Sequence, residues 1–169
     1  MEDILWVAGI AKNSIVDGPG IRYTIFTQGC LHRCPGCHNP ETWDLEKGNP
    51  AKLENLLNEI KNTKLLQGVT FTGGDPFLQA PLLARLGKAI KQMGLDLLVY
   101  TGYTWEELKA KSDPDYEELL AVTDILIDGP FKEAEKDLSL PFRGSRNQRV
   151  INVPASLNSG EIVLAELAG

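Results

Sequence analysis

Short apolar segments alternate with amphipathic segments along most of the chain. Four apolar segments are rich in β-branched or aromatic residues and end in glycine or proline, so they predict strands. These are residues 21–29 (IRYTIFTQG), 68–74 (GVTFTGG), 95–102 (LDLLVYTG) and 124–130 (DILIDGP). Weaker patterns predict two more strands, in residues 148–154 (QRVINVP) and 161–167 (EIVLAEL).

The segments between these strands have helical features. Asn49-Pro50 is a typical helix opening, and the leucines and isoleucine that follow recur with the spacing of one helix face. A second helix is predicted over residues 81–93, because Gly94 is a typical helix stop. Thr104 and Glu107 form a capping box for a short helix, and Asp113-Pro114 caps another that runs to Val122.

Strands that alternate with helices predict a parallel sheet with right-handed crossovers. A closed eight-stranded barrel takes about 250 residues, and this chain has 169. We therefore expect a single α/β domain over residues 1–169, built as an incomplete, open parallel (βα) barrel of about five to six strands. Ligands bind at the carboxyl ends of such strands, and every unusual segment of the sequence follows a predicted strand.

The composition is ordinary for a globular protein, with 43% hydrophobic and 24% charged residues. A net charge of -6 disfavours a non-specific nucleic-acid binder, which would be basic. No apolar run approaches the ~20 residues of a membrane span, and the N-terminus lacks the basic segment of a secretory signal. The sequence thus favours a cytoplasmic protein.

All three cysteines of the chain lie in one short segment, as Cys30, Cys34 and Cys37. An odd, closely spaced set indicates metal ligands and not disulfides. Structural zinc needs four ligands, so a Cys3His site would require His32 or His38. A [4Fe-4S] cluster held by three cysteines would instead leave one iron open for a ligand.

The spacing C-x3-C-x2-C resembles the signature of the radical S-adenosylmethionine (SAM) superfamily. The segment VDGPGIRYTIFTQGCLHRCPGCHNPETWD is similar to the start of glycyl-radical-enzyme activating proteins. The segments TFTGGDPF, VYTGYTWEEL and DILIDGPFKEAEKDLSLPFRGSRNQRVI, with the short length, resemble the activating proteins of anaerobic (class III) ribonucleoside-triphosphate reductases. The resemblance covers roughly residues 9–153.

This resemblance implies an enzyme in which the three cysteines hold one [4Fe-4S] cluster that binds SAM. An external electron donor, such as flavodoxin or ferredoxin, would reduce the cluster. SAM would then be cleaved to methionine and a 5′-deoxyadenosyl radical, which would take a hydrogen from a glycine of the anaerobic reductase. The protein partner would be that reductase, and no nucleic acid or membrane would take part.

The resemblance also assigns site residues. Gly73, Gly74 and Asp75 match a GGEP motif that contacts the SAM amino group, with Asp in place of Glu. Gly36, Cys37 and His38 would line the adenine pocket, although the aromatic residue usual before the third cysteine is here Gly36. Asp128, at the end of a predicted strand, would help to hold SAM. The basic residues Arg143, Arg146 and Arg149 are either a solvated loop or a dock for a carboxylate or for the partner.

Three alternatives remain open on the sequence alone. The first is an activase of another glycyl radical enzyme, such as pyruvate formate-lyase. The second is 7-carboxy-7-deazaguanine synthase, which acts on a small molecule and fits the RGSRNQR segment poorly. The third is a non-enzymatic zinc-binding interaction module.

Overall fold

The computed structural model describes residues 3–32, 34–37 and 40–167, and this part of the chain contains one seven-stranded sheet. The strands are β1 (Ile4–Ser14), β2 (Arg22–Thr27), β3 (Asn49–Lys52), β4 (Gly68–Gly73), β5 (Asp96–Tyr100), β6 (Ile125–Asp128) and β7 (Arg149–Asn152). The α-helices are α1 (Leu53–Asn62), α2 (Ala80–Gln92), α3 (Trp105–Ala110), α4 (Pro114–Val122) and α5 (Val153–Ser159). Three short 3-10 helices are η1 (Pro40–Thr42), η2 (Pro76–Gln79) and η3 (Glu133–Glu135). None of the helices in the described part is long and apolar enough to cross a membrane.

The sheet is mixed, in the order β3-β1-β2-β4-β5-β6-β7. Its centre consists of four parallel strands, β2, β4, β5 and β6, which are the four strands most clearly indicated by the sequence. The outer strands are antiparallel to their neighbours, with β1 and β3 at one side and β7 at the other. The predicted α/β class is confirmed, and the carboxyl ends of the four central strands lie at one edge.

The strand count of five to six is too low, because β1 and β3 have no predicted counterpart. The pairing of β1 with β2 has two register irregularities, so β1 does not follow one regular alternation. Pro50 lies in β3, an edge strand, where proline removes no ladder hydrogen bond that the sheet needs. The helix predicted to open at Asn49-Pro50 therefore begins only at Leu53. Residues 161–167 form no strand of their own and are joined to β7 by one bridge, at Leu164.

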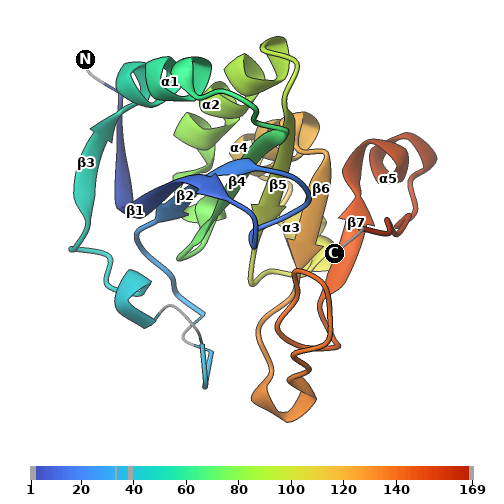
Figure 1. Cartoon of the computed structure of the whole chain (residues 1–169). Helices are drawn as coiled ribbons and strands as arrows, with labels where there is room; N and C mark the ends of the chain where they lie inside the picture. Colours follow the sequence, from blue (N-terminus) through green and yellow to red (C-terminus); the bar gives the residue numbers. More distant parts are fainter. Residues whose placement is uncertain (1–2, 33, 38–39, 168–169) are drawn as a thin grey trace.

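One face of the sheet and the helices α1, α2 and α4 form the main hydrophobic core. Alternate residues of the central strands, such as Val69, Phe71 and Val99, are fully buried against helix residues that include Leu83 and Leu119. Figure 1 shows these helices gathered on one side of the sheet. The helices therefore leave the opposite face and the carboxyl edge of the sheet free for other segments.

The opposite face is partly polar and is covered by the turn that joins β1 to β2. Arg22 is fully buried there and donates through Nη1 to the Pro19 carbonyl at 3.0 Å and through Nε to Thr70 Oγ1 at 2.7 Å. Its guanidinium also pairs with Asp96. The Thr70 hydroxyl donates in turn to the Asp17 carbonyl at 2.9 Å. These bonds hold the DGPG turn against the sheet.

Candidate functional site

A cavity of about 110 Å³ lies at the carboxyl edge of the parallel strands. All three cysteines line it, together with residues that follow β4, β5 and β6. In Figure 1 the blue-to-cyan segment after β2 and the orange segment after β6 both extend beyond this edge of the sheet. The lining residues are Cys30, His32, Cys34, Cys37, Thr72, Gly73, Gly74, Tyr100, Thr101, Gly102, Gly129, Phe131 and Gln148. The segments that follow the parallel strands therefore meet at one edge of the sheet, as the sequence predicts; that this edge carries the chemistry stays a prediction.

None of the three cysteines, all of which the structure describes, is in a disulfide, and each is half-buried. The Cys30 N–H donates to the Trp43 carbonyl at 3.2 Å, and the Cys37 N–H donates to the Cys34 carbonyl at 3.1 Å, so the loop turns back on itself. Burial raises the pKa of the Cys34 thiol, and a hydrogen bond from the Phe131 backbone opposes that rise. All three cysteines of the loop thus form part of the cavity wall.

Three cysteines in the wall of one cavity are compatible with a cluster. A [4Fe-4S] cluster held by three cysteines keeps one iron open for a further ligand. Structural zinc would need a fourth ligand beside them. Of the two histidines considered for a zinc site, His32 is bonded to Asp75, and His38 lies outside the described residues.

Gly73 and Gly74 bring the end of β4 against the start of the cysteine loop. A Cβ on Gly74 would lie 2.2 Å from the Gly29 carbonyl oxygen, and one on Gly73 would lie 2.5 Å from the Thr27 nitrogen. Gly73 also has a φ of +93°, which disfavours any other residue. The backbone bonds continue past the strand, from Gly74 N–H to Thr27 and from Asp75 N–H to Gly29, both at 2.8 Å. These glycines position the loop whether or not they also contact SAM.

The Asp75 carboxylate is buried and is occupied by the protein itself. It accepts hydrogen bonds from the Phe77 and Gly102 N–H groups, each at 3.0 Å, and from the Thr101 hydroxyl at 2.9 Å. The His32 Nε2 lies 2.5 Å away and completes the set. Asp75 is not among the residues that line the cavity. A contact between SAM and this residue stays a prediction, and the structure gives the carboxylate a different set of partners.

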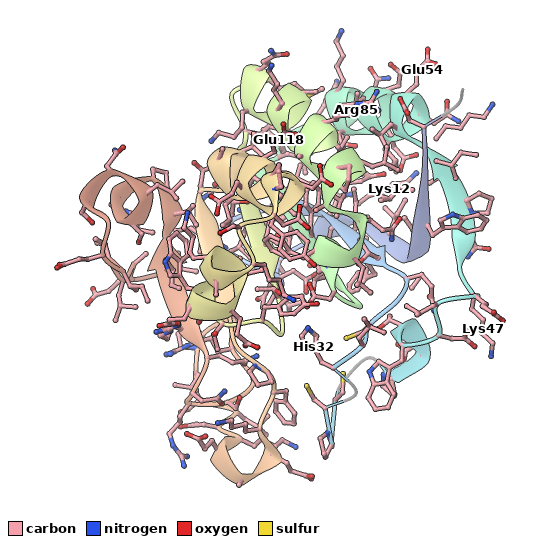
Figure 2. The ribbon with its side chains drawn as sticks, turned by 180° about the vertical axis from the view of Figure 1, so that it is seen from behind. Lys12, His32, Lys47, Glu54, Arg85 and Glu118 are labelled. Carbon is pink, nitrogen blue, oxygen red and sulfur yellow. The ribbon has the colours of Figure 1, made fainter. Side chains whose placement is uncertain are left out.

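His32 lies between the first two cysteines, and its side chain points from the loop toward the body of the protein (Figure 2). Its ring meets the Tyr103 ring edge-on, with the centroids 4.6 Å apart. The hydrogen bond to Asp75 raises the pKa of the imidazole. The sequence suggests a role for His32 only as a zinc ligand. In the structure, its side chain connects the cysteine loop to the edge of the sheet.

Asp128 ends β6 and is also buried, but it faces a different set of groups. Its carboxylate accepts from the Trp105 N–H at 2.8 Å and from the Arg149 guanidinium at 2.6 and 3.1 Å. Arg149 also pairs with Glu106, which lowers the pKa of that exposed carboxyl group. Asp128 does not line the cavity, so its predicted contact with SAM stays a prediction. Arg149 has a structural partner and is not a free dock.

A second, larger cavity of about 440 Å³ adjoins the first. The two share Cys37, Thr72, Tyr100, Phe131 and Gln148. The further residues that line the larger cavity are Val16, Asp17, Phe26, Phe142, Arg143 and Gly144. The two cavities together therefore extend from the cysteine loop across the polar face of the sheet.

The three arginines that lie close together in the sequence have different surroundings in the structure. Arg143 lies in its wall and donates to the Gln148 carbonyl at 2.9 Å, and its buried Nε has no partner in the described part of the chain. Arg146 is exposed, and Arg149 is paired. Gly36, predicted for the adenine pocket, has a φ of +75° and faces Phe131 and the Glu133 side chain.

Sequence reasoning missed Thr72, Phe131 and Gln148 as cavity residues. Thr72 and Phe131 stand within three residues of predicted strand ends, so the strand-end rule itself was a signal for both. No such signal points to Gln148, because this residue reaches the cavity only through the long segment that follows β6. Its amide donates to the Gly129 carbonyl at 3.1 Å and its side-chain oxygen accepts from the Gly144 N–H at 2.9 Å.

Comparisons with known proteins agree with this cysteine-lined site. Residues 16–151 match the family model described as a 4Fe-4S single cluster domain. A relative from Pasteurella multocida (strain Pm70), an anaerobic ribonucleoside-triphosphate reductase-activating protein, is 43% identical over 143 residues, which are 79% of this chain and 89% of the relative. The chain belongs to this family of activating proteins.

Two further relatives are similar to this chain. The Escherichia coli (strain K12) protein of the same name is 38% identical over 144 residues, which are 80% of this chain and 91% of the relative. A pyruvate formate-lyase-activating enzyme from Staphylococcus aureus (strain USA300) is 36% identical over 150 residues, which are 85% of this chain but only 59% of the relative. The chain is thus similar to activating proteins of two kinds, and the match covers a larger share of the first kind than of the second.

Proposed function

We propose that this protein activates an anaerobic ribonucleoside-triphosphate reductase by radical SAM chemistry. The observation that carries the proposal is the cavity that holds all three cysteines at the carboxyl edge of the parallel strands. Cys30, Cys34 and Cys37 would bind three irons of a [4Fe-4S] cluster and leave the fourth iron to SAM. When bound, the reduced cluster and SAM supply a 5′-deoxyadenosyl radical that removes a hydrogen from a glycine Cα of the reductase.

The residues of this chain have separate tasks in the proposal. The cysteine loop and the strand ends would partly enclose the site and limit the access of water to a reactive centre. Gly73 and Gly74 leave backbone groups exposed to the cavity, where they would contact the SAM amino group. Gly36 and Cys37 would line the adenine pocket, with His38 beyond the described residues.

The larger cavity would hold the remainder of SAM and the segment of the partner that carries the target glycine. Its walls combine apolar groups, such as Val16 and Phe142, with the cationic side chain of Arg143. The Arg143 guanidinium is bonded only through Nη1 to the Gln148 carbonyl among the hydrogen bonds of the described residues, and a guanidinium binds a carboxylate well. We therefore assign to Arg143 the anion-binding role that the sequence left open among three arginines.

The proposal extends to the domain architecture, the cellular compartment and the electron donor of the protein. The chain would be one radical SAM domain over residues 1–169, with its sheet curved as an incomplete barrel. It would act in the cytoplasm and receive its electron from an external donor such as flavodoxin or ferredoxin. An activase of pyruvate formate-lyase is the alternative, favoured only by the similarity to the Staphylococcus aureus enzyme.

The test is an anaerobic activation assay with two candidate partners. The reconstituted, reduced protein is mixed with SAM and either an anaerobic ribonucleotide reductase or pyruvate formate-lyase, and electron paramagnetic resonance (EPR) detects the glycyl radical. A radical on the reductase alone supports the proposal. A radical on pyruvate formate-lyase alone selects the alternative. Deoxyadenosine without a radical on either protein moves the substrate elsewhere, including to a small molecule.

A further inference from the structure

The cysteine loop is joined to the sheet edge by a side chain that is not a cysteine. His32 lies two residues after Cys30 and two before Cys34, and its Nε2 lies 2.5 Å from Asp75 Oδ2. Asp75 is 43 residues further along the chain and belongs to the turn after β4. The contact therefore connects two segments that the sequence separates widely.

The acceptor in this contact is fixed. Asp75 is 1% exposed, and three other donors orient its carboxylate: the Phe77 N–H, the Thr101 hydroxyl and the Gly102 N–H. A buried carboxylate held by several donors has little freedom to turn. A side chain bonded to it is consequently held in place as well.

The imidazole also fits a slot that is shaped for it. The Tyr103 ring stands edge-on to it at 78°. On another side Gly102 has no side chain, and a Cβ there would lie 2.5 Å from the His32 Cδ2. Glycine at position 102 thus provides the space that the His32 ring occupies. Two contacts of different kinds and one required glycine set the position of a single side chain.

Three other described residues of the loop are exposed, whereas His32 is partly buried. Leu31 is 58% exposed, and Pro35 and Gly36 are exposed as well. Cys34 is bonded to the Phe131 backbone, which belongs to the segment after β6. The His32 contact adds a connection to the turn after β4 and the end of β5. Loops whose ligands are held before the metal arrives pay less ordering entropy on binding.

We propose that His32 is a positioning residue, which holds Cys30 and Cys34 at the cavity through its bond to Asp75 before a cluster is bound. The inference rests on the proposed function only in taking these cysteines as cluster ligands. It assigns the Asp75 side chain to the loop and not to SAM.

The test measures the loop in two states of the full chain. The variant His32→Phe keeps a ring in the slot but removes the donor to Asp75, and His32→Gln restores a donor. Leu31→Ala is the matched control, because it changes an exposed residue of the same loop. Hydrogen–deuterium exchange of the amides in residues 30–37 is followed in the cluster-free protein, and iron loss to a chelator is followed in the reconstituted protein.

The His32→Phe variant should raise loop exchange and the rate of iron loss by about tenfold, the effect of one hydrogen bond to a charged group. His32→Gln should recover part of both, and Leu31→Ala should change neither. Gly102→Ala provides a second route, since the added methyl group displaces the ring while His32 remains. Wild-type exchange and iron loss in both His32→Phe and Gly102→Ala would overturn the inference.

The two proposals fail in different ways. If the wild-type protein binds no cluster, the proposed function fails, while the exchange data still decide whether His32 holds the loop. If the wild-type protein binds a cluster and cleaves SAM but His32→Phe retains wild-type exchange and iron loss, only the positioning role fails.

Discussion

Two buried aspartates at the same edge of the sheet, Asp75 after β4 and Asp128 at the end of β6, have different partners. Each is 1% exposed. Asp75 binds the cysteine loop through His32 and the end of β5 through Thr101. Asp128 binds the start of α3 and, through Arg149, the strand β7. Both occupy positions where the family resemblance predicts SAM contacts, yet neither lines the cavity.

The comparison shows that the location of an acidic residue does not define its role. Parallel topology brings both carboxylates to the functional edge. The hydrogen-bond donors around each carboxylate determine which segments that carboxylate connects. Asp75 connects the candidate ligand loop to the end of β5, whereas Asp128 connects the start of α3 to β7. Variants of the two residues should therefore affect cluster retention very differently.

Loss of a cluster ligand should have the largest effect, with which the effects of the aspartate variants can be compared. Cys34→Ala should abolish SAM cleavage, because the cluster loses one of three ligands, while the fold remains. Deoxyadenosine formation and circular dichroism measure the two properties. A variant with normal turnover would refute the role of Cys34 as a ligand.

Asp75→Asn should have the next largest effect, because an amide group would face donors that now bind a carboxylate. We expect the free energy of unfolding of the cluster-free protein to fall by about 2 kcal/mol and iron loss to a chelator to accelerate severalfold. Denaturant titration and chelation kinetics measure these changes. Unchanged iron retention would show that Asp75 does not hold the loop.

Asp128→Asn should lower the free energy of unfolding by a similar amount, about 2 kcal/mol, because it weakens a buried partner of Arg149. Iron retention should stay at the wild-type level, since the hydrogen-bond partners of Asp128 among the described residues are Trp105 and Arg149, outside the cysteine loop. The same two measurements apply. Iron loss as fast as in Asp75→Asn would remove the distinction between the two aspartates.

Glu106→Gln should have the smallest effect, below about 1 kcal/mol, because Glu106 is exposed and its pair with Arg149 is screened by solvent. Arg149 lowers the pKa of Glu106. The pair therefore stabilises the fold above the unfolded-state pKa and loses that contribution as pH falls through the lower, folded-state value. Acid unfolding curves should show a slightly shallower loss for the variant, and a large neutral-pH destabilisation would contradict this.

Much of the fold follows from local sequence patterns. The four central strands, the capping box of Thr104 and Glu107, and the cap at Asp113 are all present as predicted. Local signals fail for β1 and β3, whose pairing depends on each other and on β2. An irregular strand and a proline-containing edge strand gain their order from tertiary contacts.

The candidate site was predictable at the level of segments but not of partners. The cysteine spacing and the strand-end rule placed the cavity correctly. They did not reveal that Asp75 binds His32 or that Asp128 binds Arg149. These partners lie 43 and 21 residues away, and hydrogen bonds over such separations have no local pattern. The glycine at position 102 likewise gains its meaning only when the His32 ring is beside it.

The most direct test of the central claim is the SAM cleavage assay on the anaerobically reconstituted, reduced protein, with iron and zinc measured on the same sample. The account predicts about four irons per chain, with 5′-deoxyadenosine formed by the wild-type protein and none formed by Cys34→Ala. Stoichiometric zinc with no deoxyadenosine would contradict it and leave a metal-binding interaction module in its place.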